Sequence, residues 1–158
     1  MAAAGRIEAR LRELGITLPE AAAPIANYVP FNLVGNLVVI SGQLPLRGGA
    51  LVAAGKLGAG VSLEQGREAA RASFLNLVAQ LKAACGGDLD RVRRVVRLGG
   101  FIACTPEFTQ HAQVMNGASD AAVEIFGEAV GRHARTTVGV PSLPLDAAVE
   151  VEGMFEIG

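Results

Sequence analysis

The last quarter of the chain, residues 133–157, contains two segments in which apolar and polar residues alternate. The first segment is Arg135–Val140, and the second is Val149–Ile157. Successive side chains of a β-strand point to opposite faces of its sheet, so this alternation predicts two strands. Each strand would present one apolar face and one polar face. Pro141 and Pro144 lie between the segments and predict a connecting loop.

The polar faces of these two strands carry the candidate site. Arg135 shares a face of the first segment with Thr137, and Glu150 shares a face of the second with Glu152 and Glu156. If the strands pair antiparallel, Arg135 lies within reach of Glu150 or Glu152. A cation held beside a carboxylate, on a face of the sheet away from the main core, is the best site that these residues indicate.

The preceding residues predict further strands and two long helices. Ser62 and Gln65 have the spacing of a capping box at a helix start. Going along the chain, the expected elements are a helix over Ala3–Leu14, strands over Tyr28–Val34 and Leu37–Gln43 joined at Gly35-Asn36, a short strand at Leu51-Val52, a helix from Leu63 that Gly86-Gly87 ends, a strand-rich segment over Arg91–Cys104, and a helix from Thr105-Pro106 to about Phe126.

This order predicts an α+β fold, with a single mixed or antiparallel β-sheet and two long helices packed on one face. An extra helix would precede the sheet at residues 3–15. The other face of the sheet, bearing Arg135 and the glutamates, would be left to water or to another subunit.

Composition narrows the class of protein. A chain of 158 residues fits one domain, residues 1–158, and is long enough to bury a core. It is 51% hydrophobic, but no apolar run approaches the roughly 20 residues of a membrane span. The N-terminal residues lack the apolar core of a signal peptide, so we expect a soluble, cytoplasmic protein with no membrane partner.

Two kinds of partner have little support in the sequence. The net charge of −1 gives no general electrostatic attraction to nucleic acid. The basic segment Arg91–Arg97 is the best argument for RNA, but it has little aromatic interleaving, and a solvated strand edge explains it better. Cys85, Cys104, His111 and His133 lack the spacing of metal ligands or of a catalytic triad, so we expect no metal and no cofactor.

Four segments, in order, resemble the Rid/YjgF family of reactive-intermediate deaminases. They are Ile25–Tyr28 (IANY), Ser41–Pro45 (SGQLP), the Ala-Arg-Thr-Thr segment that contains Arg135, and the Leu-Pro…Val-Glu-Val-Glu segment that contains Glu150. The resemblance covers about residues 25–157. It implies a chorismate-mutase-like fold, assembled as a homotrimer with sites in the clefts between subunits.

The resemblance also implies an activity. The substrate would be a small enamine or imine acid of the 2-aminoacrylate type, and the products a 2-oxo acid and ammonium. Arg135 would bind the substrate carboxylate, and Glu150 would position water and shuttle protons. The other residues that match site positions of the family are Tyr28, Ser41, Gly42, Asn116 and Thr137.

Each of these residues also has a purely structural explanation. Arg135 could pair with Glu150 or Glu152, Glu150 could lie on a solvated strand face, and Tyr28 could fill the edge of the sheet. Two other functions stay open: a carboxylate-binding protein without turnover, and an endoribonuclease or translation inhibitor. Thr137 and His133 depart from the family pattern, in which a cysteine and a proline stand at these positions, and this favours a divergent branch.

Overall fold

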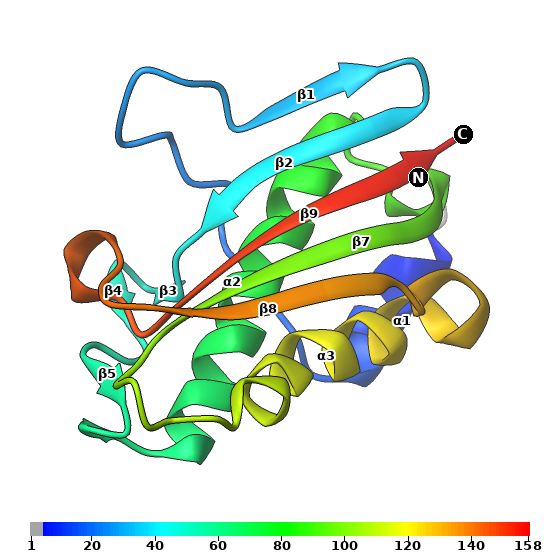
Figure 1. The fold of residues 1–158 in the computed structure, drawn as a ribbon. Helices are drawn as coiled ribbons and strands as arrows, with labels where there is room; N and C mark the ends of the chain where they lie inside the picture. The colour runs from blue at the N-terminus through cyan, green and yellow to red at the C-terminus, as the bar shows by residue number, and fades with distance from the viewer. Residues whose placement is uncertain (1–4) are drawn as a thin grey trace.

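The computed structural model describes residues 5–158, and within this range the main sheet has five strands in the order β1-β2-β9-β7-β8 (Figure 1). The strands of this sheet are β1 (Phe31–Val34), β2 (Leu37–Gln43), β7 (Val92–Ala103), β8 (Ala134–Val140) and β9 (Val149–Ile157). Two small two-stranded sheets lie in the connection after β2, formed by β3 (Leu46–Arg47) with β4 (Ala50–Leu51) and by β5 (Lys56–Leu57) with β6 (Gly60–Val61). The helices are α1 (Arg6–Glu13), α2 (Leu63–Ala84) and α3 (His111–Gly131), with 3₁₀ turns at Leu89–Arg91 and Pro144–Asp146.

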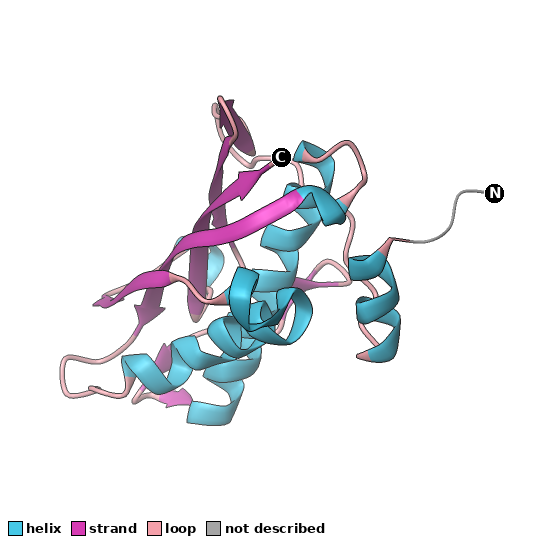
Figure 2. Cartoon of the chain, turned by 90° about the vertical axis from the view of Figure 1, so that its right-hand side faces the viewer, coloured by secondary structure: helices cyan, strands magenta, loops and turns pink. Residues whose placement is uncertain are grey.

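The two long helices, α2 and α3, cover one face of the sheet, which confirms the predicted α+β fold (Figure 2). Ser62 caps α2 as expected: its hydroxyl accepts a hydrogen bond from the Gln65 amide at 3.1 Å, and the Gln65 side chain accepts one from the Ser62 amide. The helices approach closely at Gly117, where a Cβ atom would clash with the backbone carbonyl of Arg67. This close packing compensates for the small side chains of both helices.

Strand β7 lies between β8 and β9, so the prediction that the last two strands could pair with each other is wrong. β7 is antiparallel to β9 and parallel to β8. Parallel neighbours need a crossover connection, and α3 supplies it. The sequence pattern of the last two strands carries no information about a strand inserted between them.

The starts of the first strand and of the last helix also differ from those expected. The first strand begins at Phe31 rather than Tyr28, and α3 begins at His111 rather than at Thr105-Pro106. The Thr105 amide donates instead to the Leu57 carbonyl at 3.0 Å, which holds this residue against β5. Thr105-Pro106 therefore has the sequence of a helix start, but these residues lead into a turn and not into a helix.

Helix α1 docks on the rest of the fold, and of the helix expected over Ala3–Leu14, residues 3 and 4 lie outside the described part of the chain. Ile7 and Leu11 are buried. The Asp90 carboxylate accepts hydrogen bonds from the Arg6 and Ile7 amides at 2.9 and 2.8 Å, so it caps the helix from a distant segment. No helix among residues 5–158 is both long and apolar enough to cross a membrane.

Candidate functional site

Arg135 and Glu150 lie on opposite faces of the sheet, which corrects the expectation that both lie on the face without helices. In the register of the sheet, Arg135 is aligned with Leu98, which is buried under the helices. Glu150 is aligned with Phe101, which lies on the opposite face, away from the helices. Residue alternation showed which side chains of β8 share a face, but the parallel register with β7 decides which face packs on α3.

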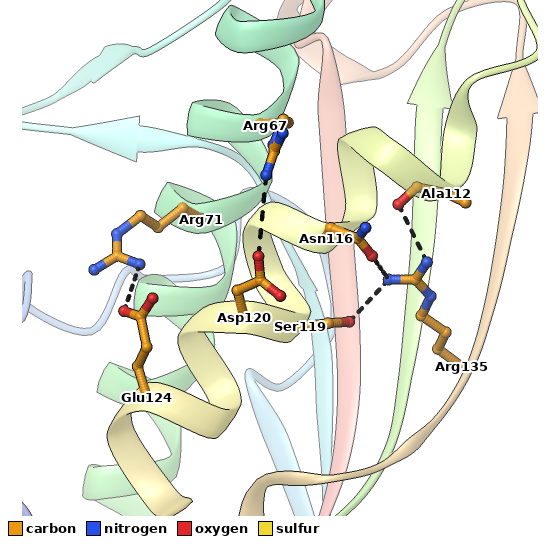
Figure 3. Close-up of polar contacts among 8 residues, drawn as sticks. All are labelled: Arg67, Arg71, Ala112, Asn116, Ser119, Asp120, Glu124 and Arg135. Carbon is orange, nitrogen blue, oxygen red and sulfur yellow. Dashed lines mark hydrogen bonds and ion pairs between the residues drawn. The ribbon is translucent and has the colours of Figure 1, made fainter. Parts of the chain in front are cut away.

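The guanidinium of Arg135 is held by three neutral acceptors of α3 (Figure 3). Nη1 donates to Asn116 Oδ1 at 2.9 Å and to Ser119 Oγ at 3.0 Å, and Nη2 donates to the Ala112 carbonyl at 3.1 Å. Within residues 5–158, no carboxylate lies within ion-pair distance of Arg135. Sequence reasoning placed Asn116 in the site and missed Ser119.

His133 extends this network. Its Nδ1 lies 2.6 Å from the Gly131 carbonyl, which can only accept, so Nδ1 carries the proton. Nε2 is then free to accept the hydrogen bond of the Ser119 hydroxyl, at 2.8 Å. Burial lowers the pKa of His133, and the nearby charge of Arg135 lowers it further. The neutral imidazole thus orients the hydroxyl that accepts from Arg135.

Thr137 lies on the same face of β8 as Arg135, aligned with Gly100 of β7. The missing side chain of Gly100 leaves room for Met115, because a Cβ atom there would lie 2.5 Å from the Met115 sulfur. The Thr137 hydroxyl oxygen is buried and has no hydrogen-bond partner in the part of the chain that the structure describes. The arginine network therefore adjoins one polar atom that is free to bond to something else.

A second group of predicted residues lines a cavity of about 430 Å³, which lies where β2 ends and β9 begins. Tyr28, Ser41, Gly42 and Glu150 all contribute to its wall, so the structure brings these four together. The register of β2 shifts between Ile40 and Gln43, so Ser41 and Gly42 form an irregular part of this strand beside the cavity. The remaining wall is mostly apolar, from Ala22 to Ile25 and at Leu44, Leu46 and Pro144.

Glu150 is the ionisable group of this cavity. Burial raises its pKa, and the neighbouring Glu152 raises it further. The Glu150 carboxyl can approach β2 closely because residue 42 is glycine: a Cβ atom there would lie 2.5 Å from Glu150 Oε1. Glu152 itself is paired with Arg97 at 3.7 Å.

Metal and RNA chemistry find little support in the described residues. No three His, Cys, Asp or Glu side chains among residues 5–158 are grouped so that they could hold a metal ion. In the basic segment, Arg91 donates to the carbonyls of Gly158 and Cys85, and Arg97 pairs with Glu152. These contacts occupy two of the arginines within the fold itself.

Comparison with known proteins identifies the family. Residues 8–157 match the model of the family described as "YjgF/chorismate_mutase-like, putative endoribonuclease". The chain belongs to this family. A curated protein of similar sequence is protein TCP17 of Trypanosoma cruzi, which is 50% identical over 157 residues in a match that covers 98% of this chain and 96% of TCP17.

Two solved structures agree with the fold. Protein Atu1372 of Agrobacterium tumefaciens, of unknown function, is 47% identical, with a TM-score of 0.89 over 96% of this chain and 92% of its own. The E. coli protein TdcF, crystallised with bound serine, is 22% identical, with a TM-score of 0.64 over 88% and 94% of the two chains. At that identity, TdcF supports the YjgF-like fold alone.

Proposed function

We propose that the protein hydrolyses small enamine and imine acids of the 2-aminoacrylate type to a 2-oxo acid and ammonium. The observation that carries this proposal is the hydrogen bonding of the N–H groups of the Arg135 guanidinium. Three of its five N–H groups are engaged by neutral acceptors, and within residues 5–158 the other two make no hydrogen bond. Two donors and an uncompensated charge are what a carboxylate needs for bidentate binding.

The proposed chemistry needs positioning and proton transfer. Arg135 would hold the carboxylate of the imine and so orient its carbon atom towards an attacking water. Glu150 would take a proton from that water and return one to nitrogen, after which the carbinolamine releases ammonia. Because burial raises the pKa of Glu150, this carboxyl exchanges protons closer to neutral pH than an exposed glutamate does. The reaction requires no covalent nucleophile.

The positions of Arg135 and Glu150 favour a site shared by two copies of the chain. Their strands, β8 and β9, are separated by β7, so the two backbones lie roughly 10 Å apart at the spacing of neighbouring strands. Their side chains point to opposite faces. A substrate of a few atoms cannot contact both groups of one chain, so we propose a homotrimer in which neighbouring copies contribute one group each.

Exposed apolar residues support this assembly. Ile25 and Val34, beside the Glu150 cavity and on β1, are 67% and 66% exposed, and Val138 on β8 is 44% exposed on the face without helices. Val34 and Val138 lie on the two edge strands of the sheet, where we expect a neighbouring subunit to contact it. The serine bound by TdcF fits the same type of ligand, because serine has a carboxylate on a three-carbon chain, as 2-aminoacrylate has.

The second candidate is a carboxylate-binding protein without turnover. The Arg135 network favours it to the same degree, since it provides for binding and supplies no reactive group. Ligand binding alone therefore does not distinguish the two functions, and a measurement of turnover does.

The test uses imines made in the assay by an amino acid oxidase, with semicarbazide as a trap. The protein should suppress semicarbazone formation in proportion to its concentration and release the 2-oxo acid faster. Glu150→Gln should retain binding of 2-oxo acids and lose most of the rate. Binding without suppression, for small and large imines alike, would reject the hydrolase and leave the binding protein.

A further inference from the structure

A second cavity, of about 550 Å³, lies where the ends of β7 and β8 meet the start of α3. None of the residues proposed above lines it. Its wall contains an amine, a thiol, a hydroxyl and an imidazole, from Lys56, Cys104, Thr105 and His111, and the bare backbone of Gly139.

The thiol and the imidazole of this cavity are in contact. Cys104 Sγ lies 3.5 Å from His111 Nε2. A Cβ atom at Gly139 would lie 2.6 Å from that nitrogen and 2.7 Å from that sulfur, so glycine at this position is what lets the pair form. Phe108 packs edge-on against the imidazole, with 5.3 Å between the ring centres, and limits its rotation.

Backbone hydrogen bonds fix the elements that carry these groups. The Cys104 amide donates to the Val140 carbonyl at 3.1 Å, and the Thr105 amide donates to the Leu57 carbonyl at 3.0 Å. The second bond holds the β5 turn, with Lys56, against the end of β7. Within residues 5–158, Lys56 forms no ion pair, so its charge at the cavity is uncompensated.

We propose that this cavity is a second site, in which Cys104, with His111 as its base, bonds covalently to small carboxylates that carry an electrophilic carbon. Burial raises the pKa of Cys104, so the group is a neutral thiol at neutral pH and needs a base to react. Lys56 supplies the cation for the carboxylate. Phe108, Pro106 and Pro141 add apolar surface to the wall. A ligand of this class would therefore meet one cation, on Lys56, and one nucleophile, the Cys104 thiol.

The step balances without an oxidant or a reductant. His111 Nε2 takes the thiol proton, the sulfur electron pair forms the S–C bond, and the leaving group departs with the electrons of its own bond to carbon. The imidazolium then returns its proton to water. In the probe iodoacetate, the bond that breaks is C–I and the leaving group is iodide.

The experiment compares iodoacetate with the neutral reagent iodoacetamide on the full chain at neutral pH. Alkylation of Cys104 and Cys85 is followed by peptide mass spectrometry, and each rate is divided by the rate of glutathione with the same reagent. Cys85 is buried and serves as the internal reference thiol. We expect Cys104 to react faster than Cys85, with a normalised preference for iodoacetate of roughly fivefold, the effect of one nearby charge in a hydrated cavity.

Variants separate the roles of the two partners. Lys56→Met should abolish the preference for iodoacetate, whereas Lys82→Met, at a lysine paired with Glu8, should leave it unchanged. His111→Phe should slow both reagents by about a hundredfold, the range of general-base assistance. Gly139→Ala, which keeps both groups and forces them apart, should slow both reagents if His111→Phe does not fold.

Two results would overturn the proposal. Equal normalised rates for both reagents, unchanged in Lys56→Met, would rule out the carboxylate class. A Cys104 that reacts no faster than Cys85, or that is unaffected by His111→Phe and Gly139→Ala, would rule out the thiol–imidazole pair.

Discussion

The Arg135 guanidinium and the Glu150 carboxylate lie on opposite faces of one sheet, with β7 between the strands that carry them. This relationship excludes the ion pair that would have given both residues a structural role within one chain. It leaves Arg135 as a cation oriented by Asn116 and Ser119, and Glu150 as a half-buried carboxyl in a separate cavity. A small substrate can use both groups if two copies of the chain meet at the site.

Replacing Arg135 by lysine tests the bidentate contact. Lysine keeps the charge and loses the planar fork, so affinity for pyruvate should fall about tenfold, or ~1.4 kcal/mol. Arg71→Lys is the matched control, because Arg71 forms a partly exposed ion pair with Glu124 at 3.2 Å. Isothermal titration should show wild-type affinity in that control. Unchanged affinity in Arg135→Lys would remove Arg135 from the binding site.

His133 predicts a loss of stability in mild acid. Because its pKa in the folded protein is lower than its ordinary value, the folded state binds fewer protons than the unfolded state as the pH falls below about 6.5. The free energy of unfolding should therefore decrease more steeply below that pH in the wild type than in His133→Gln. The raised pKa of Glu150 acts in the opposite direction and cancels in this comparison, since both proteins contain it. Parallel pH profiles of urea unfolding would contradict the half-buried neutral imidazole.

Asp90 ties α1 to the fold. Hydrogen bonds from the Ile7 and Arg6 amides lower the pKa of this carboxyl, so its stabilising effect is present at neutral pH and is lost as the pH falls through the lowered pKa. Asp90→Ala should lower the free energy of unfolding by about 1 kcal/mol at pH 7, as the loss of a helix cap does. Asp120→Ala, at the end of a long 4.0 Å contact with Arg67, should change it by less than about 0.5 kcal/mol. Equal effects of the two substitutions, in urea titrations, would mean that α1 does not depend on this cap.

Local patterns predicted the elements whose boundaries depend on nearby residues. The strands Leu37–Gln43 and Val149–Ile157 are found as expected, because alternation and the turn at Gly35 define them within a few residues. The start of α2 was likewise predictable from Ser62 and Gln65. The start of α3 was not, because Thr105 is held in a turn against Leu57, which lies far away in the sequence.

The arrangement of the candidate site depended on information that alternation does not contain. The pattern of β8 groups Arg135 with Thr137, but the side they face follows from pairing with β7 and from packing on α3. The contacts of Ser119 with His133 and of Cys104 with His111 also join different elements. Neither histidine has a spacing signal, so sequence reasoning assigned them no partner.

The most direct test of the shared site is complementation between two inactive variants. Arg135→Ala and Glu150→Gln chains, carrying different tags, are co-expressed, and the mixed oligomers are purified through both tags. In a cyclic trimer that contains both variants, in either ratio, one site in three combines an intact Arg135 of one copy with an intact Glu150 of its neighbour. We predict that imine hydrolysis, absent in each variant alone, recovers to roughly that fraction of the wild-type rate, and that light scattering gives a trimer mass. No recovery in mixed oligomers, or a monomer mass with full wild-type activity, would contradict a site built from two copies of the chain.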